Sequence, residues 1–397
     1  MRVPLDPRRL ALCLEPFPDR ARTLPAAAYT SPEVFAWEQE HFFEGSWVCV
    51  GRSSAAGEPG DQLALHAGRE GILLVRDVTG ELRAFSNVCR HRGHELVRGT
   101  GPARGKAIRC PYHRWTYGLD GTFIGGPGLA SQPGFDKRDP DHSLVQVRAV
   151  EWRGWVFVNV SGDAPPFEDH LGSLDDLVAD YEPERLFVGA SHRYEIAANW
   201  KIVVENYHEC YHCSEIHPEL CTVSSPGSGE DYEPSGLVIG GSMELLPHAE
   251  TMSLDGISLG VPFRKLSEAA RRDVHYVQIF PNVLLSIHPD YVMTHILEPL
   301  DAGRTRIDCS WLFPPEARER EAFSPSYAAE FWDTTNQEDW AACESVQVGV
   351  GRRGYRQSPF SSAEHVVHQS MALVAHGYLE GGAPRPVEHR GTESALA

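Results

Sequence analysis

The sequence has little positive charge and no long apolar run. Its 397 residues carry 36 Lys and Arg against 55 Asp and Glu, for a formal net charge of −19. Nucleic-acid and anionic-membrane surfaces need basic patches, so we expect neither kind of partner. No apolar stretch approaches the roughly 18 residues of a membrane span, and residues 1–30 lack the apolar core of a signal peptide. We therefore expect a cytoplasmic protein.

Cysteine is not used here in the manner of a disulfide-rich protein. Nine cysteines are an odd number in a long chain without an export signal, which predicts a reducing compartment and metal or catalytic roles for cysteine clusters. Residues 349–354 match the dinucleotide pattern GxGxxG, but they follow a predicted helix and no acidic residue comes about 20 residues later. The sequence thus predicts no nicotinamide or flavin site of its own.

The pattern of apolar, polar and turn-forming residues divides the chain into four parts. We expect an N-terminal arm at 1–45 with a short helix at 32–43, a small all-β domain at 46–161, a mixed domain at 162–380, and a disordered polar tail at 381–397. Asp77–Gly80 and Leu119–Gly121 are turn signals for two hairpins in the β domain. In the mixed domain we expect a strand at 186–196, a helix at 200–217, loops or short strands at 227–260, an antiparallel meander at 274–313, and helices at 326–347 and 361–379.

Two Cys/His pairs in the β domain are the strongest signal in the sequence. Cys89-Arg90-His91 is followed, after eighteen residues, by Cys110-Pro111-Tyr112-His113. Four such ligands could hold zinc tetrahedrally or a [2Fe–2S] cluster with thiolates on one iron and imidazoles on the other. A structural zinc site usually contains Cys-x-x-Cys pairs, and neither half has one, so the pattern favours the cluster.

A second candidate site lies in the ionisable segment 205–217. His208-Glu209-x-x-His212 matches the HExxH pattern of zinc proteases, with Glu209 as the base. The competing interpretation combines His212, His217 and a distant carboxylate into the facial triad of non-haem Fe(II) oxygenases, which leaves positions open for O₂ and substrate. A [2Fe–2S] cluster has no role in peptide hydrolysis, so we prefer the triad. A five-residue step does not stack on an ideal helix, so the helix should distort or end near Glu215, before Pro218.

The flanking residues resemble a known family. Cys89–Gly93 and Cys110–Trp115 are similar to the two cluster-binding loops of Rieske proteins, and Asn199–Lys201, Glu205-Asn206 and the carboxylate before His212 extend the resemblance to Rieske non-haem iron oxygenases, in particular their catalytic α subunits. The resemblance implies an α+β fold with an N-terminal all-β Rieske [2Fe–2S] domain. A C-terminal helix-grip (START-like) catalytic domain with a curved antiparallel sheet would follow it.

The resemblance also implies a role for each site residue. It assigns Cys89, His91, Cys110 and His113 to the cluster, and His212, His217 and Asp339 to one mononuclear Fe(II), with Asn206 beside the ligands. Glu338 and Asp333 are rivals of Asp339 within a turn of the same helix. Glu209 would bridge a cluster histidine of one subunit to His212 of the next in a head-to-tail homotrimer, since one subunit would hold its two metals too far apart for fast electron transfer.

The implied activity needs O₂ as cosubstrate and NAD(P)H, supplied through a separate flavin/iron–sulfur reductase. Glu209 with Cys210 and Cys213 resembles the carnitine and glycine betaine monooxygenase branch, which implies N-demethylation of a small quaternary ammonium such as glycine betaine. Hydroxylation or dihydroxylation of an aromatic or natural-product substrate is the alternative within the family. Outside it, two other classes stay open: an electron-transfer or sensing protein with a fused ligand-binding domain, and a zinc hydrolase.

A quaternary ammonium would need an aromatic cage, and a betaine carboxylate would need a cation or donors. Arg264 and Lys265 are candidate cations close in sequence to an aromatic residue. The candidate cage residues are Phe263, Tyr276, Phe280, Tyr291, Trp311 and Trp332.

Overall fold

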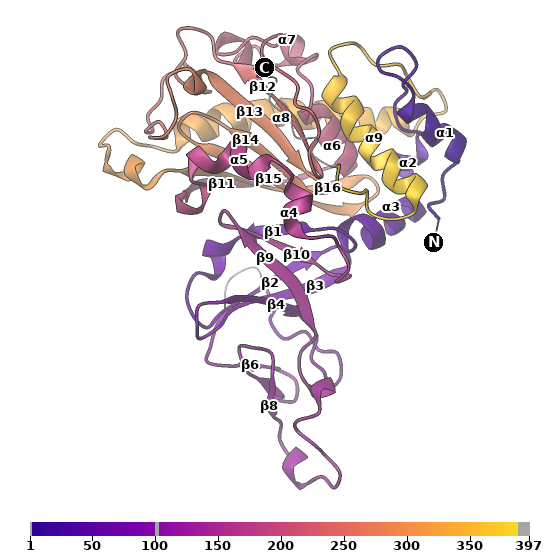
Figure 1. The fold of residues 1–397 in the computed structure, drawn as a ribbon, viewed down its shortest axis with the longest axis vertical. Coiled ribbons are helices and arrows are strands. Elements are labelled where there is room, and N and C mark those ends of the chain that lie inside the picture. The colour runs from indigo at the N-terminus through magenta and orange to yellow at the C-terminus, as the bar shows by residue number, and fades with distance from the viewer. Residues whose placement is uncertain (1, 100–102, 388–397) are drawn as a thin grey trace, which may run out of the picture. The chain divides into compact units, whose positions relative to one another are not determined.

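The computed structural model describes residues 2–99 and 103–387 (Figure 1). The chain folds into two compact units: one comprises residues 43–164, and the other comprises the residues before and after that segment. The N-terminal arm therefore belongs to the same unit as the predicted catalytic domain. None of the helices in the described part of the chain is long and apolar enough to cross a membrane.

The unit of residues 43–164 is built of two antiparallel sheets. Both expected hairpins are present: β3 and β4 turn at Asp77, whose Oδ1 accepts the backbone N–H groups of Thr79 and Glu81 at 2.8 and 3.0 Å, and β7 and β8 turn at Gly121. The seven-stranded sheet has the order β1-β10-β9-β4-β3-β2-β5, and the three-stranded sheet has the order β6-β7-β8. The strands are β1 (Val48–Arg52), β2 (Asp61–Ala67), β3 (Glu70–Arg76), β4 (Leu82–Ser86), β5 (Ala103–Arg104), β6 (Ile108–Arg109), β7 (Thr116–Tyr117), β8 (Phe123–Gly125), β9 (Gln146–Trp152) and β10 (Trp155–Asn159).

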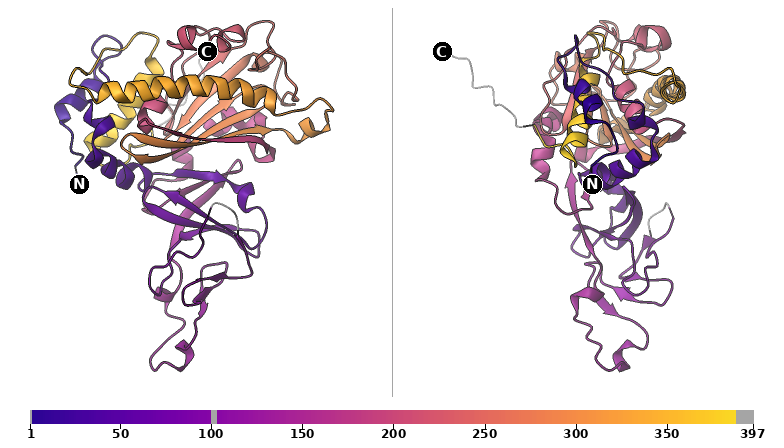
Figure 2. Two further views of the ribbon diagram at one scale, coloured as in Figure 1. Left: turned by 180° about the vertical axis from the view of Figure 1, so that it is seen from behind. Right: turned by 90° about the vertical axis from the view of Figure 1, so that its right-hand side faces the viewer.

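A six-stranded, curled antiparallel sheet forms the centre of the other unit, in the order β11-β16-β15-β14-β13-β12. The expected meander is present, and the segment expected as loops or short strands supplies the edge strand β12. The long helix α8 (Ser326–Val350) lies across one face of this sheet, as the view from behind in Figure 2 shows. The strands are β11 (Phe187–Ile196), β12 (Val238–Glu244), β13 (Asp273–Ile279), β14 (Val283–Ile287), β15 (Val292–Asp301) and β16 (Arg304–Phe313).

The other helices of this unit are short, except for the last one. Helix α9 begins four residues later than expected, because residues 361–364 form a turn before it. The helices are α1 (Pro7–Ala11), α2 (Ala27–Thr30), α3 (Pro32–Glu38), α4 (Phe167–Leu171), α5 (Leu174–Val178), α6 (Trp200–Tyr207), α7 (Cys213–Ile216) and α9 (His365–Glu380).

A buried carboxylate on α3 ties the N-terminal arm to α6 and α9. Glu38 is 0% exposed and forms an ion pair with Lys201 Nζ at 2.6 Å. Its second oxygen accepts the Trp200 Nε1–H at 2.9 Å, and Tyr378 Oη–H donates to the first. Burial lowers the pKa of Lys201, while Glu38 favours its charged form. The start of α6, nine residues before the candidate bridge Glu209, is thereby fixed.

The helix expected at 200–217 is interrupted, and this part of the prediction is wrong. Helix α6 ends at Tyr207, and His208 turns its side chain inward, where Nε2 lies 2.9 Å from the Gln278 side-chain oxygen on β13. Glu209 then accepts the backbone N–H groups of Tyr211 and His212, which leads into α7. The break places His212 and His217 at either end of one short helical turn.

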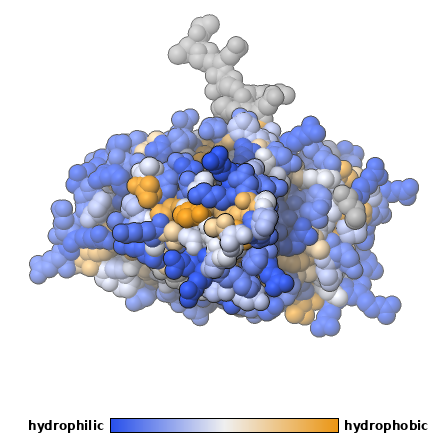
Figure 3. Space-filling view, turned by 90° about the horizontal axis from the view of Figure 1, so that it is seen from below, coloured by the Kyte–Doolittle hydropathy of each residue, from blue (hydrophilic) through white to orange (hydrophobic). Residues whose placement is uncertain are grey.

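The predicted tail at 381–397 is described only as far as Val387, and residues 388–397 lie outside the described part. Val387 exchanges two backbone hydrogen bonds of 2.8 and 3.1 Å with Gly236. The face drawn in Figure 3 is mainly hydrophilic with small apolar patches.

Candidate functional site

The two Cys/His loops of the β unit have the same backbone turn. Cys89 O accepts the N–H of Gly93 at 3.0 Å, and Cys110 O accepts the N–H of Arg114 at 3.1 Å. The fourth residue after each cysteine is left-handed, with φ of +72° at Gly93 and +59° at Arg114. Such a turn is easy for glycine and strained for arginine. Two equivalent tight loops therefore present their side chains to one another.

Burial divides the four candidate cluster ligands into two pairs. Cys89 and Cys110 are 2% and 1% exposed, whereas His91 is exposed and His113 is partly exposed, with the two imidazole centroids 4.7 Å apart. Partial desolvation and the neighbouring charge of His113 lower the pKa of His91, which favours the neutral form that binds metal. Inner thiolates and outer imidazoles fit a Rieske [2Fe–2S] cluster.

A tyrosine that the sequence analysis missed lies against the inner pair. Tyr117 Oη is 3.2 Å from Cys89 Sγ and accepts the backbone N–H of Arg90 at 3.1 Å. When the sulfur is a thiolate, the hydroxyl donates to it, and hydrogen bonds to cluster sulfurs tune the reduction potential. Its distance of 28 residues from Cys89 in sequence hides this contact.

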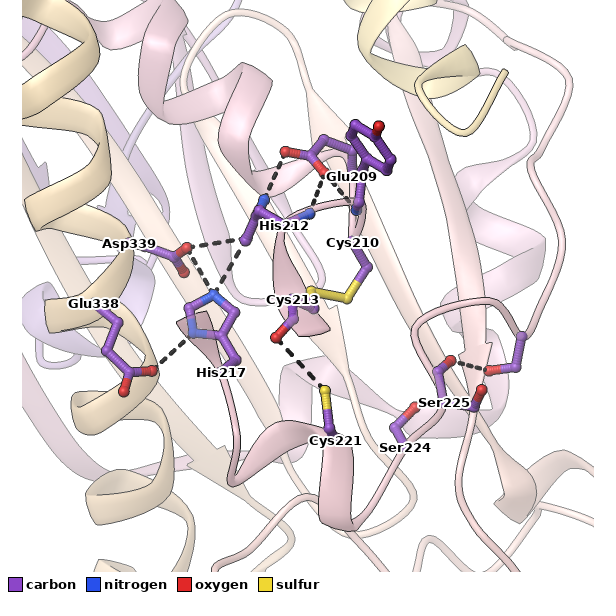
Figure 4. Close-up of a disulfide and its surroundings, with 12 residues drawn as sticks. Glu209, Cys210, His212, Cys213, His217, Cys221, Ser224, Ser225, Glu338 and Asp339 are labelled. Atoms are coloured by element: carbon purple, nitrogen blue, oxygen red, sulfur yellow. Dashed lines mark hydrogen bonds and ion pairs between the residues drawn. A yellow bond between two sulfur atoms is a disulfide. The ribbon is translucent and has the colours of Figure 1, made fainter. Parts of the chain in front are cut away.

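In the other unit, three candidate ligand atoms form a nearly equilateral triangle (Figure 4). His217 Nε2 lies 3.0 Å from Asp339 Oδ1 and 3.2 Å from His212 Nε2, and the third edge, His212 Nε2 to Asp339 Oδ1, is 3.3 Å. Ligands about 2.1 Å from one metal and roughly at right angles would be about 3 Å apart. The triangle therefore has the size of one face of an octahedral metal site.

Each imidazole of the triangle is held from behind by a glutamate (Figure 4). Glu209 Oε1 accepts from His212 Nδ1 at 2.6 Å, and Glu338 Oε2 accepts from His217 Nδ1 at 2.8 Å. These bonds assign the proton to Nδ1 and leave both Nε2 lone pairs for a metal. Glu338, a rival ligand in the sequence analysis, thus contacts the far nitrogen of His217 instead of joining the triangle.

The carboxylates give this site an affinity for positive charge. Burial disfavours the cationic form of His212, but Asp339 and Glu209 outweigh burial and raise its pKa to about 9. For Asp339, burial is likewise outweighed by the two histidines, which lower its pKa. A site that stabilises charge in this way is suited to a divalent cation.

Three other candidates for this site lie elsewhere or lack a free ligand atom. His208 is 8% exposed and its pKa is lowered to about 4 by burial, against its bond to Gln278, so the HExxH interpretation has no first ligand in the triangle. Asp333 Oδ1 accepts the hydroxyl of Tyr194 at 2.6 Å. Cys213 Sγ lies within 4.8 Å of both imidazoles, but it is bonded to another sulfur.

That sulfur belongs to Cys210, and the disulfide differs from our expectation that cysteine clusters in this chain lie in a reducing compartment and have metal or catalytic roles. The Cα atoms are 4.9 Å apart, because the interruption between α6 and α7 brings positions 210 and 213 to one side of the turn. Cys221 donates from Sγ to the carbonyl of Cys213 at 3.5 Å (Figure 4).

The triangle lines the wall of a cavity of about 1030 Å³, with open solvent at its mouth included. Asn206 and Glu209 line the same cavity. Of the six candidate cage residues, Tyr276 and Trp332 line it, whereas Phe263, Phe280, Tyr291 and Trp311 are buried and are not among its lining residues. Arg264 and Lys265 pair instead with Glu316 and Glu182, at 3.5 and 3.4 Å, so they do not serve this cavity.

Comparison with known proteins identifies the family. Residues 46–136 match the Rieske [2Fe–2S] domain, and residues 183–378 match the catalytic domain of the ring-hydroxylating alpha subunit. The glycine betaine monooxygenase oxygenase subunit of Chromohalobacter salexigens is 31% identical over 372 residues, 85% of this chain and 82% of the relative. The chain belongs to the Rieske non-haem iron monooxygenase family.

Other relatives support this placement. The carnitine monooxygenase oxygenase subunit of Escherichia coli K12 is 33% identical over 350 residues, 85% of this chain and 87% of the relative. A crystal structure of the quaternary ammonium Rieske monooxygenase CntA with substrate L-carnitine aligns with a TM-score of 0.76 at 28% identity, covering 93% of this chain and 98% of that one. Naphthalene 1,2-dioxygenase from Rhodococcus sp. shares the fold, with a TM-score of 0.75 at 20% identity over 94% of this chain and 96% of that one.

The two matched domains imply a Rieske cluster and a mononuclear iron for this family member. The inner thiols and outer imidazoles fit the first, and the triangle fits the second. Another solved structure of a quaternary ammonium Rieske monooxygenase, with a TM-score of 0.78 at 28% identity over 95% of this chain and 100% of that one, gives insight into inter-subunit electron transfer in that protein.

Proposed function

We propose that this chain is the oxygenase component of a two-protein monooxygenase that N-demethylates a small quaternary ammonium compound such as glycine betaine. The observation that carries the proposal is the triangle of His212, His217 and Asp339 at the wall of a cavity that also contains the rings of Tyr276 and Trp332. The relatives named as glycine betaine, carnitine and choline monooxygenases support this class of substrate.

His212, His217 and Asp339 would hold Fe(II), which supplies O₂ binding and activation when it is bound. Three protein ligands on one face leave the cavity side free for small molecules. The Tyr276 and Trp332 rings, 6.3 Å apart, offer π faces to a cation that has lost its water. One oxygen atom enters an N-methyl C–H bond and the other becomes water with two electrons and two protons. The hydroxymethyl product then releases formaldehyde and the demethylated amine.

The electrons would come from NAD(P)H through a separate flavin/iron–sulfur reductase in the cytoplasm. Cys89, His91, Cys110 and His113 would hold the [2Fe–2S] cluster, and exposed His91 lies where a partner can approach. In a head-to-tail homotrimer, Glu209 would connect His212 to a cluster histidine of the neighbouring subunit. The bond between Glu209 and His212 within one chain supports the first half of this bridge.

The test is a reductase-coupled assay of formaldehyde release over a panel of betaines, choline and aryl acids. We expect NADH- and O₂-dependent formaldehyde from a quaternary ammonium substrate. Asp339→Ala should lower turnover more than about a hundredfold, since even the outer partners of metal ligands are worth 10–100-fold. The same variant should keep the visible and resonance spectra of the cluster.

Glu330→Ala is the matched control, because Glu330 is an exposed carboxylate on the same helix. It should turn over at the wild-type rate. An aryl hydroxylation without formaldehyde would replace our substrate class with the ring-hydroxylating alternative. A colourless zinc protein that hydrolyses peptides would overturn the proposal altogether.

A further inference from the structure

The cavity beside the triangle contains buried polar atoms that have no hydrogen-bond partner in the described part of the chain. Asn336 Nδ2, Trp340 Nε1 and both ring nitrogens of His295 lie in this wall without a hydrogen-bond partner among the described residues, although Asn336 lies near enough to His295 to oppose the lowering of its pKa by burial. Asn336 and His295 are only 3% and 2% exposed. Buried polar atoms are almost always paired, so a cluster of these atoms at a cavity wall takes its partners from the cavity contents, which are water or a bound ligand.

These side chains come from two elements that meet at the cavity. Asn336 and Trp340 are four residues apart on α8, and therefore lie on one face of that helix. His295 on β15 approaches the same face, with its ring centroid 6.1 Å from that of Trp340. Asp339 belongs to the same turn of α8, so this donor wall lies beside the candidate iron ligands.

The chemistry of the donor wall favours an acceptor without hydrogens of its own. An indole N–H and an amide NH₂ can only donate, and a neutral imidazole offers one further donor. A carboxylate has two oxygens that only accept, so it can pair with several of these atoms at once. A hydroxyl has a single oxygen, so it can pair with fewer of these donors than a carboxylate can.

The described lining of the cavity offers no basic side chain for that carboxylate. No Lys or Arg is found among its described lining residues, whereas Glu209, Asp231 and Asp339 are there. A free anionic substrate would find no basic side chain in the described lining to pair with, which makes its burial unfavourable. A betaine brings its own cation, so neutral donors are enough for its carboxylate, and its ammonium can face the rings and acids.

We propose that Asn336, Trp340 and His295 form a neutral donor cradle that binds the carboxylate of a zwitterionic betaine substrate and makes the enzyme prefer betaines to choline-like amino alcohols. This inference rests on the proposed function, whose substrate class it narrows. These three are specificity-determining residues and take no part in the oxygen chemistry. A substrate that lacks the acceptor leaves buried donors unpaired, which is how a polar site rejects a near-isostere.

The experiment measures binding of glycine betaine, choline and tetramethylammonium to the purified holoenzyme by anaerobic calorimetry without reductase. Wild type should bind glycine betaine at least about tenfold more tightly than either other ligand, as expected for one or more charge-assisted hydrogen bonds. Trp340→Phe keeps an aromatic ring and removes the N–H. This variant should bind glycine betaine about tenfold more weakly than wild type, and its affinity for tetramethylammonium should not change.

Trp332→Phe is the matched control on the same helix and cavity. Its indole N–H already donates to Tyr291 Oη at 2.7 Å, so its loss should not change the ratio of glycine betaine to tetramethylammonium affinity. Asn336→Leu, similar in size, gives a second removal of a donor and should act like Trp340→Phe. It also keeps the test decisive if one variant does not fold.

The outcomes separate the cradle from the proposed function. If Trp340→Phe and Asn336→Leu both leave the affinity ratio unchanged, or if choline binds wild type as tightly as glycine betaine, the cradle is wrong while the enzyme class stands. If wild type binds no quaternary ammonium, the proposed substrate class is wrong as well.

Discussion

The two candidate histidine ligands of the iron site differ in the carboxylate that holds them. His212 is oriented by Glu209, three residues earlier in the same turn, whereas His217 is oriented by Glu338, which comes from α8. Glu338 and Asp339 are adjacent in sequence, so α8 contributes one carboxylate to the triangle and one behind it. The first glutamate has a second proposed role in electron transfer between subunits, but Glu338 has none, and this difference can be tested.

Glu338→Ala should weaken Fe(II) binding about 10–100-fold, the usual cost of removing the partner of a metal-bound histidine. The imidazole of His217 would lose the bond that holds Nε2 toward the metal. Titration of the iron-free protein with Fe(II) measures the change. At saturating iron, electron delivery should stay close to wild type.

Glu209→Gln is the matched comparison, because an amide oxygen still accepts from His212 Nδ1. It should keep most of the iron affinity and slow single-turnover electron delivery. If both variants change only metal affinity, Glu209 has no bridging role.

His170 on α4 predicts how stability depends on pH at a site remote from the metals. Its Nε2–H donates to the carbonyl of Phe280 at 2.8 Å, and burial lowers its pKa from 6.5 to about 4 despite that bond. Between pH 6.5 and about 4, His170 binds a proton in the unfolded chain but stays neutral in the folded chain. The stability that the neutral side chain contributes is therefore fully present above pH 6.5 and is lost as the pH falls toward 4. Wild type should lose about 2 kcal/mol through this side chain between pH 7 and pH 5.

The measurement is the free energy of unfolding of the catalytic unit in urea at the two pH values. His170→Gln retains a donor for Phe280 O and removes the titrating ring, so its loss of stability should be smaller by that amount. Equal losses in the two proteins would show that His170 is accessible to protons in the folded state.

At the scale of elements, the sequence predicted those turns and loops whose shape depends on contacts between residues close together in the chain. The hairpins at Asp77 and Gly121 follow from turn residues within a few positions, and the two Cys/His loops follow from their spacing. The break between α6 and α7 could not be predicted in this way, because it depends on the bond between His208 and Gln278, which is 70 residues away in sequence. The roles of Glu338 and of the donor wall are hidden for the same reason: a strand and a helix that meet only in the fold create them.

The anchor of α6 predicts a strong dependence on one buried ion pair. Glu38→Gln leaves Lys201 buried without its counter-charge, and removing one partner of such a pair usually costs about 3–5 kcal/mol. The amide oxygen can still accept from Trp200, which isolates the charge. Adding Lys201→Met should restore most of the lost stability, since a buried pair can often be replaced by apolar packing.

Urea denaturation of the two single variants and the double variant measures this coupling. Iron content should fall in Glu38→Gln as α6 loosens and recover in the double variant. Additive effects of the two substitutions would mean that Lys201 and Glu38 do not depend on each other in solution.

At the scale of the whole molecule, each of the two units carries one candidate metal site, and activity requires both. Cys110→Ser should abolish the cluster, and Asp339→Ala should abolish the mononuclear iron, so each variant alone should be inactive in the coupled assay. Whether the two centres of one chain serve each other, or serve neighbouring copies, decides what a mixture of these variants does. In a head-to-tail ring, one surface of each subunit contacts a different surface of the next subunit, so each cluster would lie beside the iron site of a neighbour.

Co-expression of the two variants with different tags tests this arrangement. In a trimer that contains both chains, one junction joins an intact cluster to an intact iron site in the right direction, so mixed trimers purified through both tags should show about one-third of wild-type turnover. Mixing the separately purified variants without subunit exchange is the control and should give none. Inactive mixed assemblies with full metal content at the intact sites would mean that electrons stay within one chain, and Glu209 would then have no neighbour to reach.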